Sequence, residues 1–190
     1  MTVSLDLDLI HPDLRAQAVA RLDAGDVGKF LLRAAGGNQY WLTIVFDNMA
    51  ALQARGLYEP ALLLAWSGCR MNYSHWSTGV LASMFGRADR ARLRACGDPL
   101  PGSGPYTLYR GVAGTERRRR VRGFSWTDDR EKAAWFAARL PELADPVIYT
   151  TVVDADAVLA YLHDGYYGRA ECEFLIMPPR KVVRVERVAA

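Results

Sequence analysis

Three stretches in the second half of this 190-residue chain decide its fold: PYTLYRG (105–111), GFSWTDDREKAAWFA (123–137) and AECEFLIMPPRKVVRV (170–185). Each contains a short run of β-branched and aromatic residues, which is typical of a strand. The first stretch ends in an arginine beside a glycine, the second holds a serine and a threonine two residues apart, and the third holds two glutamates separated by a cysteine. The chain is therefore predicted to place a cation, a hydroxyl pair and two carboxylates on successive strands.

The rest of the second half extends this β-rich pattern. Apolar runs predict strands at residues 106–111, 122–126, 147–153, 171–177 and 182–188. Alanines and aromatics at helical spacing predict a helix at 131–140, with Asp128 and Glu131 at the spacing of a capping box. A second, short helix is predicted to begin at residue 154 or 156 and to end at residue 162.

The first half is predicted to be mostly helical. Apolar residues spaced by three and four predict helices at 11–24, 47–55, 60–66 and 77–95. One run, QYWLTIVF (39–46), is typical of a strand, and the segment 97–105 holds three prolines and three glycines, which predict a turn or connector. We therefore expect an α+β fold with a helix-rich N-terminal subdomain at 1–104 and a β core at 105–190, packed as one compact unit.

The composition restricts the class of protein. Hydrophobic residues make up 51% and charged residues 24% of the chain, which excludes disorder, and a net charge of +3 is too small to indicate nucleic acid by itself. No apolar run approaches the roughly 20 residues that cross a bilayer, and the acidic N-terminus lacks a secretory signal. Three widely spaced cysteines fit reduced thiols, and the histidines have no metal-ligand spacing. We expect a cytoplasmic protein, in the producing cell or in a cell into which it is delivered, without a membrane partner or a metal.

The arginine and the hydroxyl pair each have a functional and a structural interpretation. Arg110 ends a strand beside Gly111, where a guanidinium can fork onto phosphate oxygens while the glycine lets a ligand approach. It could equally be an arginine at the rim of a sheet, paired with a surface carboxylate. Ser125 and Thr127 present two hydroxyls on one side of a strand, which an ordinary half-exposed strand edge also carries.

The two glutamates are the sharpest feature of the sequence. If Glu171 and Glu173 lie on one strand they share a face, and Cys172 lies on the other. Two carboxylates this close do not favour stability, since like charges raise each other's pKa. The pair therefore favours a functional site, and the alternative is an acidic solvent-exposed face of an edge strand.

Taken together and in this order, the three stretches resemble the arginine–serine–glutamate triad of the mono-ADP-ribosyltransferase superfamily. SWT corresponds to the family's Ser-Thr-Ser motif, with Trp126 in the middle position, and DDREKAAWFA is similar to the helix that follows it. ECE corresponds to the family's E-x-E motif, and FLIMPPRKVVRV to its strand, proline turn and closing strand. The resemblance implies a split, strongly bent β-sandwich that binds NAD in the cleft between its two sheets.

The resemblance also implies which residues bind NAD. Arg110 and Gly111 would hold the diphosphate, and Ser125 and Thr127 would line the nicotinamide pocket. The helix-rich N-terminal half would cover this cleft.

Catalysis and acceptor recognition are assigned by the same resemblance. Glu173 would be the catalytic residue, which bonds a ribose hydroxyl and stabilises the developing cation, and Glu171 would orient or deprotonate the acceptor. Tyr166 and Tyr167, in the loop before the glutamates, would contact the acceptor protein. A glutamate at the first E-x-E position is the family's signature for arginine acceptors.

The function implied is transfer of ADP-ribose from NAD to a macromolecular acceptor, a protein arginine, with release of nicotinamide. Small enzymes of this family in bacteria and their phages act as toxins or effectors. One alternative is an NAD glycohydrolase with the same site and water as the acceptor. Another is a catalytically inactive fold that binds protein or nucleic acid through the arginines at 117–120 and the tyrosine loop. Such a basic run is more often a solvated loop, so nucleic acid is not the favoured partner.

Overall fold

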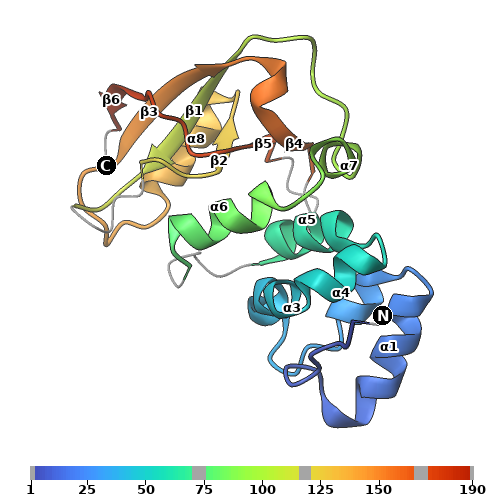
Figure 1. Cartoon of the computed structure of the whole chain (residues 1–190). Helices are drawn as coiled ribbons and strands as arrows, with labels where there is room; N and C mark the ends of the chain where they lie inside the picture. Colours follow the sequence, from blue (N-terminus) through green and yellow to red (C-terminus); the bar gives the residue numbers. More distant parts are fainter. Residues whose placement is uncertain (1–2, 70–75, 116–120, 165–170, 189–190) are drawn as a thin grey trace. The chain divides into compact units, whose positions relative to one another are not determined.

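The structure is a computed structural model that describes residues 3–69, 76–115, 121–164 and 171–188. The chain divides into two compact units, Met1–Cys96 and Gly97–Ala190. In the described residues the first unit is helical and the second contains the sheet, so the α+β class predicted from the sequence is confirmed (Figure 1).

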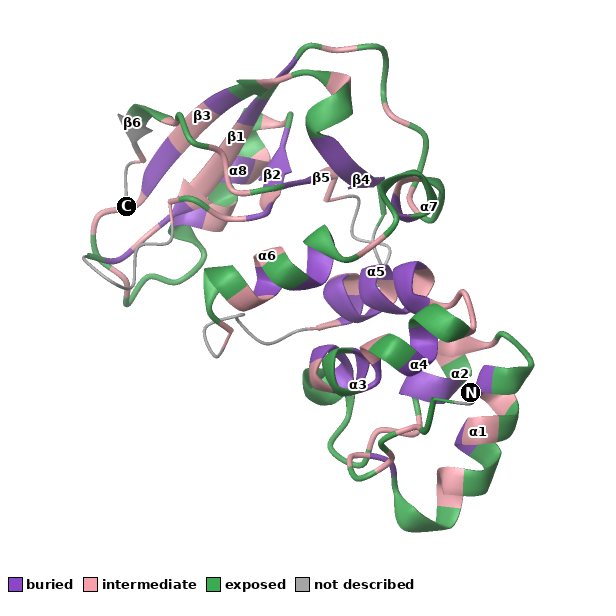
Figure 2. Cartoon of the chain, in the orientation of Figure 1, coloured by how far each residue is buried: buried purple, intermediate pink, exposed green. Residues whose placement is uncertain are grey.

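The first unit is built from short helices around an apolar core. They are η1 Pro12–Leu14, α1 Arg15–Asp23, α2 Val27–Leu31, η2 Asn38–Tyr40, α3 Trp41–Asp47, α4 Met49–Ala54, α5 Tyr58–Gly68, α6 Thr78–Gly86 and α7 Arg90–Ala95. The longest of these, α5, is buried over most of its surface (Figure 2). A helix that is apolar on nearly all sides can only lie inside the core, so α5 organises this unit.

The run QYWLTIVF is helical, and the predicted strand at 39–46 is wrong. Its β-branched and aromatic residues favour a strand locally, but Trp41, Leu42, Ile44 and Val45 are buried at helical spacing on α3. The ring of Trp41 lies against Gly68 of α5, where an added Cβ would come within 2.3 Å of it. Tertiary packing against α5 therefore overrides the strand propensity.

The arginine-rich segment at 77–95 forms two helices instead of the predicted one. Ser77 caps α6 by accepting the Val80 N–H at 3.1 Å, and Asp89 caps α7 by accepting the Arg92 N–H at 2.9 Å. A buried carboxylate of α5, Glu59, accepts the Asp89 N–H at 2.9 Å and pairs with Arg92 at 3.4 Å. Arg92 therefore helps to hold α7 on α5.

The second unit is a six-stranded antiparallel sheet with the strand order β4-β5-β2-β1-β3-β6. Its elements are β1 Tyr106–Val112, β2 Ser125–Thr127, α8 Arg130–Ala138, β3 Val147–Val153, η5 Ala155–Ala157, β4 Val158–Leu162, β5 Glu173–Ile176 and β6 Val183–Arg187. All five predicted strands and the helix predicted at 131–140 are present, although β2 and β5 are shorter than expected. Asp129, one residue after the expected Asp128, is the N-cap of α8.

The segment predicted as a helix between residues 154 and 162 is mostly a strand. After the short turn η5, all five residues of β4 are buried, and they pair with β5. A short apolar run such as VLAYL fits either structure in sequence, because its length and burial do not distinguish a helix from a central strand. Pairing with β5, the next strand along the chain, decides for the strand.

The sheet is least paired between β1 and β2. Their register contains the single pair Tyr109↔Thr127, whereas β1 pairs with β3 along its whole length, from Tyr106↔Val153 to Val112↔Val147. Two sheets were expected from the sequence, but the strand pairing connects all six strands into one. The β1–β2 junction is the place where this sheet comes closest to dividing.

The two faces of the sheet are covered differently. One face carries an aromatic cluster in which the Phe174 ring lies 5.0 Å from Tyr106 and 4.7 Å from Tyr161, with Trp126 buried beside them. Helix α8 packs on β1 (Figure 1), and a Cβ added at Gly111 would lie 1.7 Å from the Ala133 carbonyl oxygen. Gly111 is therefore required for close helix packing, a different reason from the ligand approach expected from the sequence.

The connector at 97–105 belongs to the second unit. The Asp98 N–H donates to the Tyr161 carbonyl at 2.8 Å, and the Asp98 carboxylate accepts the His163 N–H at 2.7 Å. These bonds tie the connector to the end of β4. The boundary between the units consequently falls at Cys96/Gly97 rather than at the expected 104/105.

Candidate active site

Strand order brings the three sequence stretches together. Arg110 lies on β1, Ser125 and Thr127 on β2, and Glu173 at the start of β5. These three strands are consecutive neighbours in the sheet, with β2 in the middle. Segments far apart in the sequence thus place the expected cation, hydroxyls and carboxylate on adjacent strands.

Arg110 bridges the weakly paired junction between β1 and β2. Its Nη1 donates to the Ser125 carbonyl at 2.6 Å. The guanidinium lies against Gly123, where an added Cβ would come within 2.5 Å of the guanidinium carbon. A side chain at Gly123, a residue that sequence reasoning did not select, would therefore displace the guanidinium from this position. The signal for it was available, since this glycine precedes the hydroxyl strand by two residues.

Thr127 and Glu173 are direct partners in the sheet. Thr127 pairs with Glu173 on one side and with Tyr109 on the other, so these three residues share a face. Alternation along β1 assigns Arg110 to the other face, from which its guanidinium reaches the main chain of β2. The structure therefore joins Arg110 to Ser125 through the backbone, and Thr127 to Glu173 through the register.

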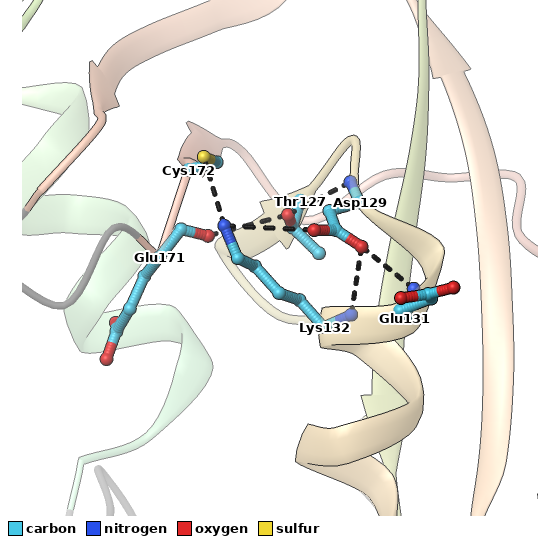
Figure 3. Close-up of polar contacts among 6 residues, drawn as sticks. All are labelled: Thr127, Asp129, Glu131, Lys132, Glu171 and Cys172. Atoms are coloured by element: carbon cyan, nitrogen blue, oxygen red, sulfur yellow. Dashed lines mark hydrogen bonds and ion pairs between the residues drawn. The ribbon is translucent and has the colours of Figure 1, made fainter.

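The hydroxyl of Thr127 also contacts two neighbouring segments of the chain. Thr127 is buried, with 5% of its surface exposed. Its Oγ1 accepts the Asp129 N–H at 3.2 Å and lies 3.5 Å from the Glu171 carbonyl oxygen (Figure 3). One threonine thus links β2, the start of α8 and the segment of the two glutamates.

The expectation that Glu171 and Glu173 share a strand face is wrong. β5 begins at Glu173, and Cys172 has a φ of 49°, in the left-handed region that non-glycine residues rarely adopt. A left-handed residue interrupts strand alternation, so the two carboxylates do not stack along one strand. In Figure 3 the Glu171 carboxylate points away from Thr127 and Cys172.

A lysine that sequence reasoning did not select lies in this region. Lys132, in the first turn of α8, donates from Nζ to the Cys172 Sγ at 3.2 Å, and its Nζ lies 3.8 Å from the Asp129 carboxylate (Figure 3). Burial raises the pKa of the Tyr161 hydroxyl, and a hydrogen bond with Cys172 raises it further. The thiol between the glutamates therefore has both a cation and a phenol as neighbours.

Other expected features of the site fall elsewhere. Tyr166 and Tyr167 lie outside the described residues, as do the arginines at 117–120. No group of three or more potential metal ligands is found in the part of the chain that the structure describes. Over the same residues, no helix is long and apolar enough to span a membrane. The three cysteines, all in described segments, form no disulfide.

Comparison of the chain with known protein families, with curated proteins and with solved structures finds no match. The functional proposal therefore depends on the geometry of the site. The half-buried guanidinium of Arg110 and the half-buried Ser125 are joined across β1 and β2. Thr127 lies opposite Glu173 across β2 and β5.

Proposed function

We propose that this protein is a mono-ADP-ribosyltransferase with the split β-sandwich fold of that superfamily. It takes NAD as its substrate and transfers ADP-ribose to a macromolecular acceptor, a protein arginine, with release of nicotinamide. The observation that carries the proposal is the adjacency of β1, β2 and β5, the strands that bear Arg110, the hydroxyl pair and Glu173. The β1–β2 junction, where a single residue pair joins the strands, is the proposed place of the split.

The residues at this junction fit the anionic half of NAD. A planar guanidinium binds a diphosphate through forked hydrogen bonds. The bond from Arg110 to the Ser125 carbonyl and the contact with Gly123 fix where that guanidinium lies, so it is held in place before a ligand arrives. Such preorganisation lowers the entropic cost of binding. Gly111 takes part by allowing α8 to pack closely against β1, on the face that alternation assigns to Tyr109, rather than by contacting the ligand.

The residues on β2 and β5 fit the reacting half. Cleavage of the N-glycosidic bond gives the nicotinamide ribose an oxocarbenium-like transition state, whose positive charge a nearby carboxylate stabilises. Glu173 supplies this carboxylate and also accepts a hydrogen bond from a ribose hydroxyl. Ser125 and Thr127 line the nicotinamide side, and the register Thr127↔Glu173 keeps a hydroxyl next to the glutamate.

The reaction balances without a further reactant. The bond between ribose C1 and the pyridinium nitrogen breaks, and its electron pair leaves with nicotinamide, which departs neutral. A guanidinium nitrogen of the acceptor forms the new bond to C1. The proton that this nitrogen loses goes to Glu171 or to water.

An NAD glycohydrolase is the second candidate, and one observation favours it. β5 begins only at Glu173, after the left-handed Cys172, and the Glu171 carboxylate does not follow the face of Glu173. An acceptor held by Glu171 would then be aligned less directly with the reacting carbon, which leaves water as a competing acceptor. The two functions share every other residue of the site.

Nicotinamide release from NAD by the full chain tests both candidates. We expect Glu173→Gln to lower kcat by at least about a hundredfold, because the amide cannot carry the stabilising charge. Glu142→Gln, an exposed glutamate of the same unit, is the matched control and should behave as wild type. Release that rises with an arginine analogue indicates transfer, and release indifferent to the analogue indicates hydrolysis. Unchanged release by a folded Glu173→Gln variant would refute this site.

A further inference from the structure

Cys172, between the two glutamates, has a backbone conformation that requires support from its surroundings. Its φ of 49° lies in the left-handed region, where the Cβ of an L-residue crowds the backbone. Glycine usually occupies such positions, and a non-glycine residue persists there only when neighbouring structure holds it. Neighbouring groups must therefore hold Cys172 in this conformation.

Three elements supply those contacts. From the end of β4, the His163 carbonyl accepts the Cys172 N–H at 3.0 Å. From α8, the Lys132 ammonium donates to the Cys172 Sγ at 3.2 Å, and from β2 the Thr127 hydroxyl lies 3.5 Å from the Glu171 carbonyl oxygen. Of these, the contact from Lys132 bears on the Cys172 side chain itself (Figure 3), which also has a hydrogen bond with the Tyr161 hydroxyl.

Lys132 is in turn held by the cap of its own helix. The Asp129 carboxylate accepts the Lys132 N–H at 3.0 Å and lies 3.8 Å from its ammonium. The Asp129 N–H donates to Thr127 Oγ1, so the cap continues into β2 (Figure 3). The start of α8 and the segment of the glutamates therefore form one connected network, and the ammonium of Lys132 lies between them.

We propose that Lys132 is a positioning residue that, through Cys172, holds the turn that sets the directions of Glu171 and Glu173. This inference rests on the proposed function and adds a residue outside the three stretches that suggested it. Without the contact, the left-handed conformation loses the hydrogen bond from α8 to the Cys172 side chain, and residue 172 relaxes toward extended backbone. Glu171 then moves relative to Glu173, while Arg110 keeps its bond to the Ser125 carbonyl.

Two readouts on the full chain test this proposal. The first is hydrogen exchange of the Cys172 and Glu173 amides, measured without NAD. The second is the kinetics of nicotinamide release, with kcat and KM separated. We expect Lys132→Met and Cys172→Ala each to speed exchange at Cys172 and to lower kcat about tenfold, with KM for NAD changed less than about twofold. Lys132→Arg, which keeps a cation, should restore most of the loss, and Lys181→Met, an exposed lysine of the same unit, is the control.

Combined variants show whether Lys132 acts through Cys172. The double variant Lys132→Met/Cys172→Ala should be no worse than Cys172→Ala alone, because that change already removes the contact with Lys132. In a Cys172→Gly background, where positive φ is freely allowed, Lys132→Met should have no further effect on kcat.

Failure of this inference is distinguishable from failure of the proposed function. Wild-type exchange and kcat in Lys132→Met would overturn the positioning role while nicotinamide release by wild type left the function intact. Faster exchange with an unchanged kcat would also overturn that role. A wild-type protein that releases no nicotinamide would overturn the proposed function, and with it any catalytic role for the pair, whatever the exchange rates are.

Discussion

The Arg110 side chain forms a structural hydrogen bond and is also the proposed contact with the diphosphate of NAD. Its bond to the Ser125 carbonyl crosses the junction where β1 and β2 share a single residue pair. The structure adds a contact that neither interpretation of the sequence named, a hydrogen bond to the main chain of the neighbouring strand. The functional interpretation remains a proposal, and the same residue can serve both purposes because the bond fixes the guanidinium.

We predict that Arg110→Ala lowers the free energy of unfolding of the second unit by about 2 kcal/mol, because a hydrogen bond from a charged donor is lost and the Ser125 carbonyl is left behind. Arg110→Lys should fall between alanine and wild type, since an ammonium cannot reproduce the planar fork. Urea denaturation measures both, with Arg122→Ala, an exposed arginine, as the control. If Arg110→Ala were as stable as wild type, the bond across the junction would make no net contribution. The proposed NAD site additionally requires a raised KM in Arg110→Lys.

The glutamate pair is a case in which strand alternation does not predict where the side chains lie. Alternation places Trp126 on the opposite face of β2 from Ser125 and Thr127, and Trp126 is 2% exposed. The same rule fails for Glu171, because it assumes an uninterrupted strand and Cys172 is left-handed. No local feature of ECE predicts that φ value. It depends on contacts from α8, β2 and β4, which the sequence does not place.

At the scale of elements, the packing of α8 on β1 depends on one glycine. A Cβ at Gly111 would lie 1.7 Å from the Ala133 carbonyl and 2.6 Å from the Ala137 nitrogen, both in the helix backbone. Backbone atoms cannot rotate away as a side chain can, so the helix would have to shift as a whole.

We predict that Gly111→Ala destabilises the second unit by about 3 kcal/mol through this overpacking. Thermal unfolding followed by circular dichroism measures the loss. Gly86→Ala is the matched control, because a Cβ there meets nothing within 4 Å, and its substitution should be neutral or slightly stabilising. Equal melting temperatures for the two variants would mean that α8 moves away without cost. The glycine would then have another purpose, such as the ligand approach first expected.

Two of the wrong element predictions arose from short apolar runs. QYWLTIVF has the composition of a strand, yet four of its residues are buried at helical spacing. VLAYL was assigned to a helix, yet it is a buried strand that pairs with β5. In each case the local preference is weaker than the free energy gained from burial against a distant partner, α5 for the first and β5 for the second.

At the scale of the whole molecule, the chain consists of two units, each with its own core. The connector contributes structure to the second unit, since Asp98 bonds Tyr161 and His163. A glycine at 97 is part of this arrangement, because a Cβ there would lie 2.6 Å from the Tyr161 carbonyl oxygen. The end of β4, where the His163 carbonyl accepts the Cys172 N–H, is therefore held by residues that lie outside the three sequence stretches.

We predict that a fragment spanning residues 97–190 unfolds cooperatively and is more stable than one spanning 105–190. Two hydrogen bonds of Asp98, one of them to its carboxylate, amount to roughly 2 kcal/mol. Urea denaturation of both fragments measures the difference, and Asp98→Ala in the longer fragment should account for about half of it. Two fragments of equal stability would place the boundary at 104/105, as the sequence first suggested.

The sequence alone determined the α+β class, the five strands recognised by their apolar runs, the helix after the hydroxyl strand, and the candidate residues Arg110, Ser125, Thr127 and Glu173. These follow from local periodicity and residue chemistry, which act over a few neighbouring positions. Only the tertiary structure decided that β1, β2 and β5 are neighbours, that 39–46 is helical, that VLAYL is a strand, and that Lys132 meets Cys172. The reason is physical: strand order, the left-handed turn and contacts between side chains depend on groups far apart in the chain, and no local pattern records which of them will meet.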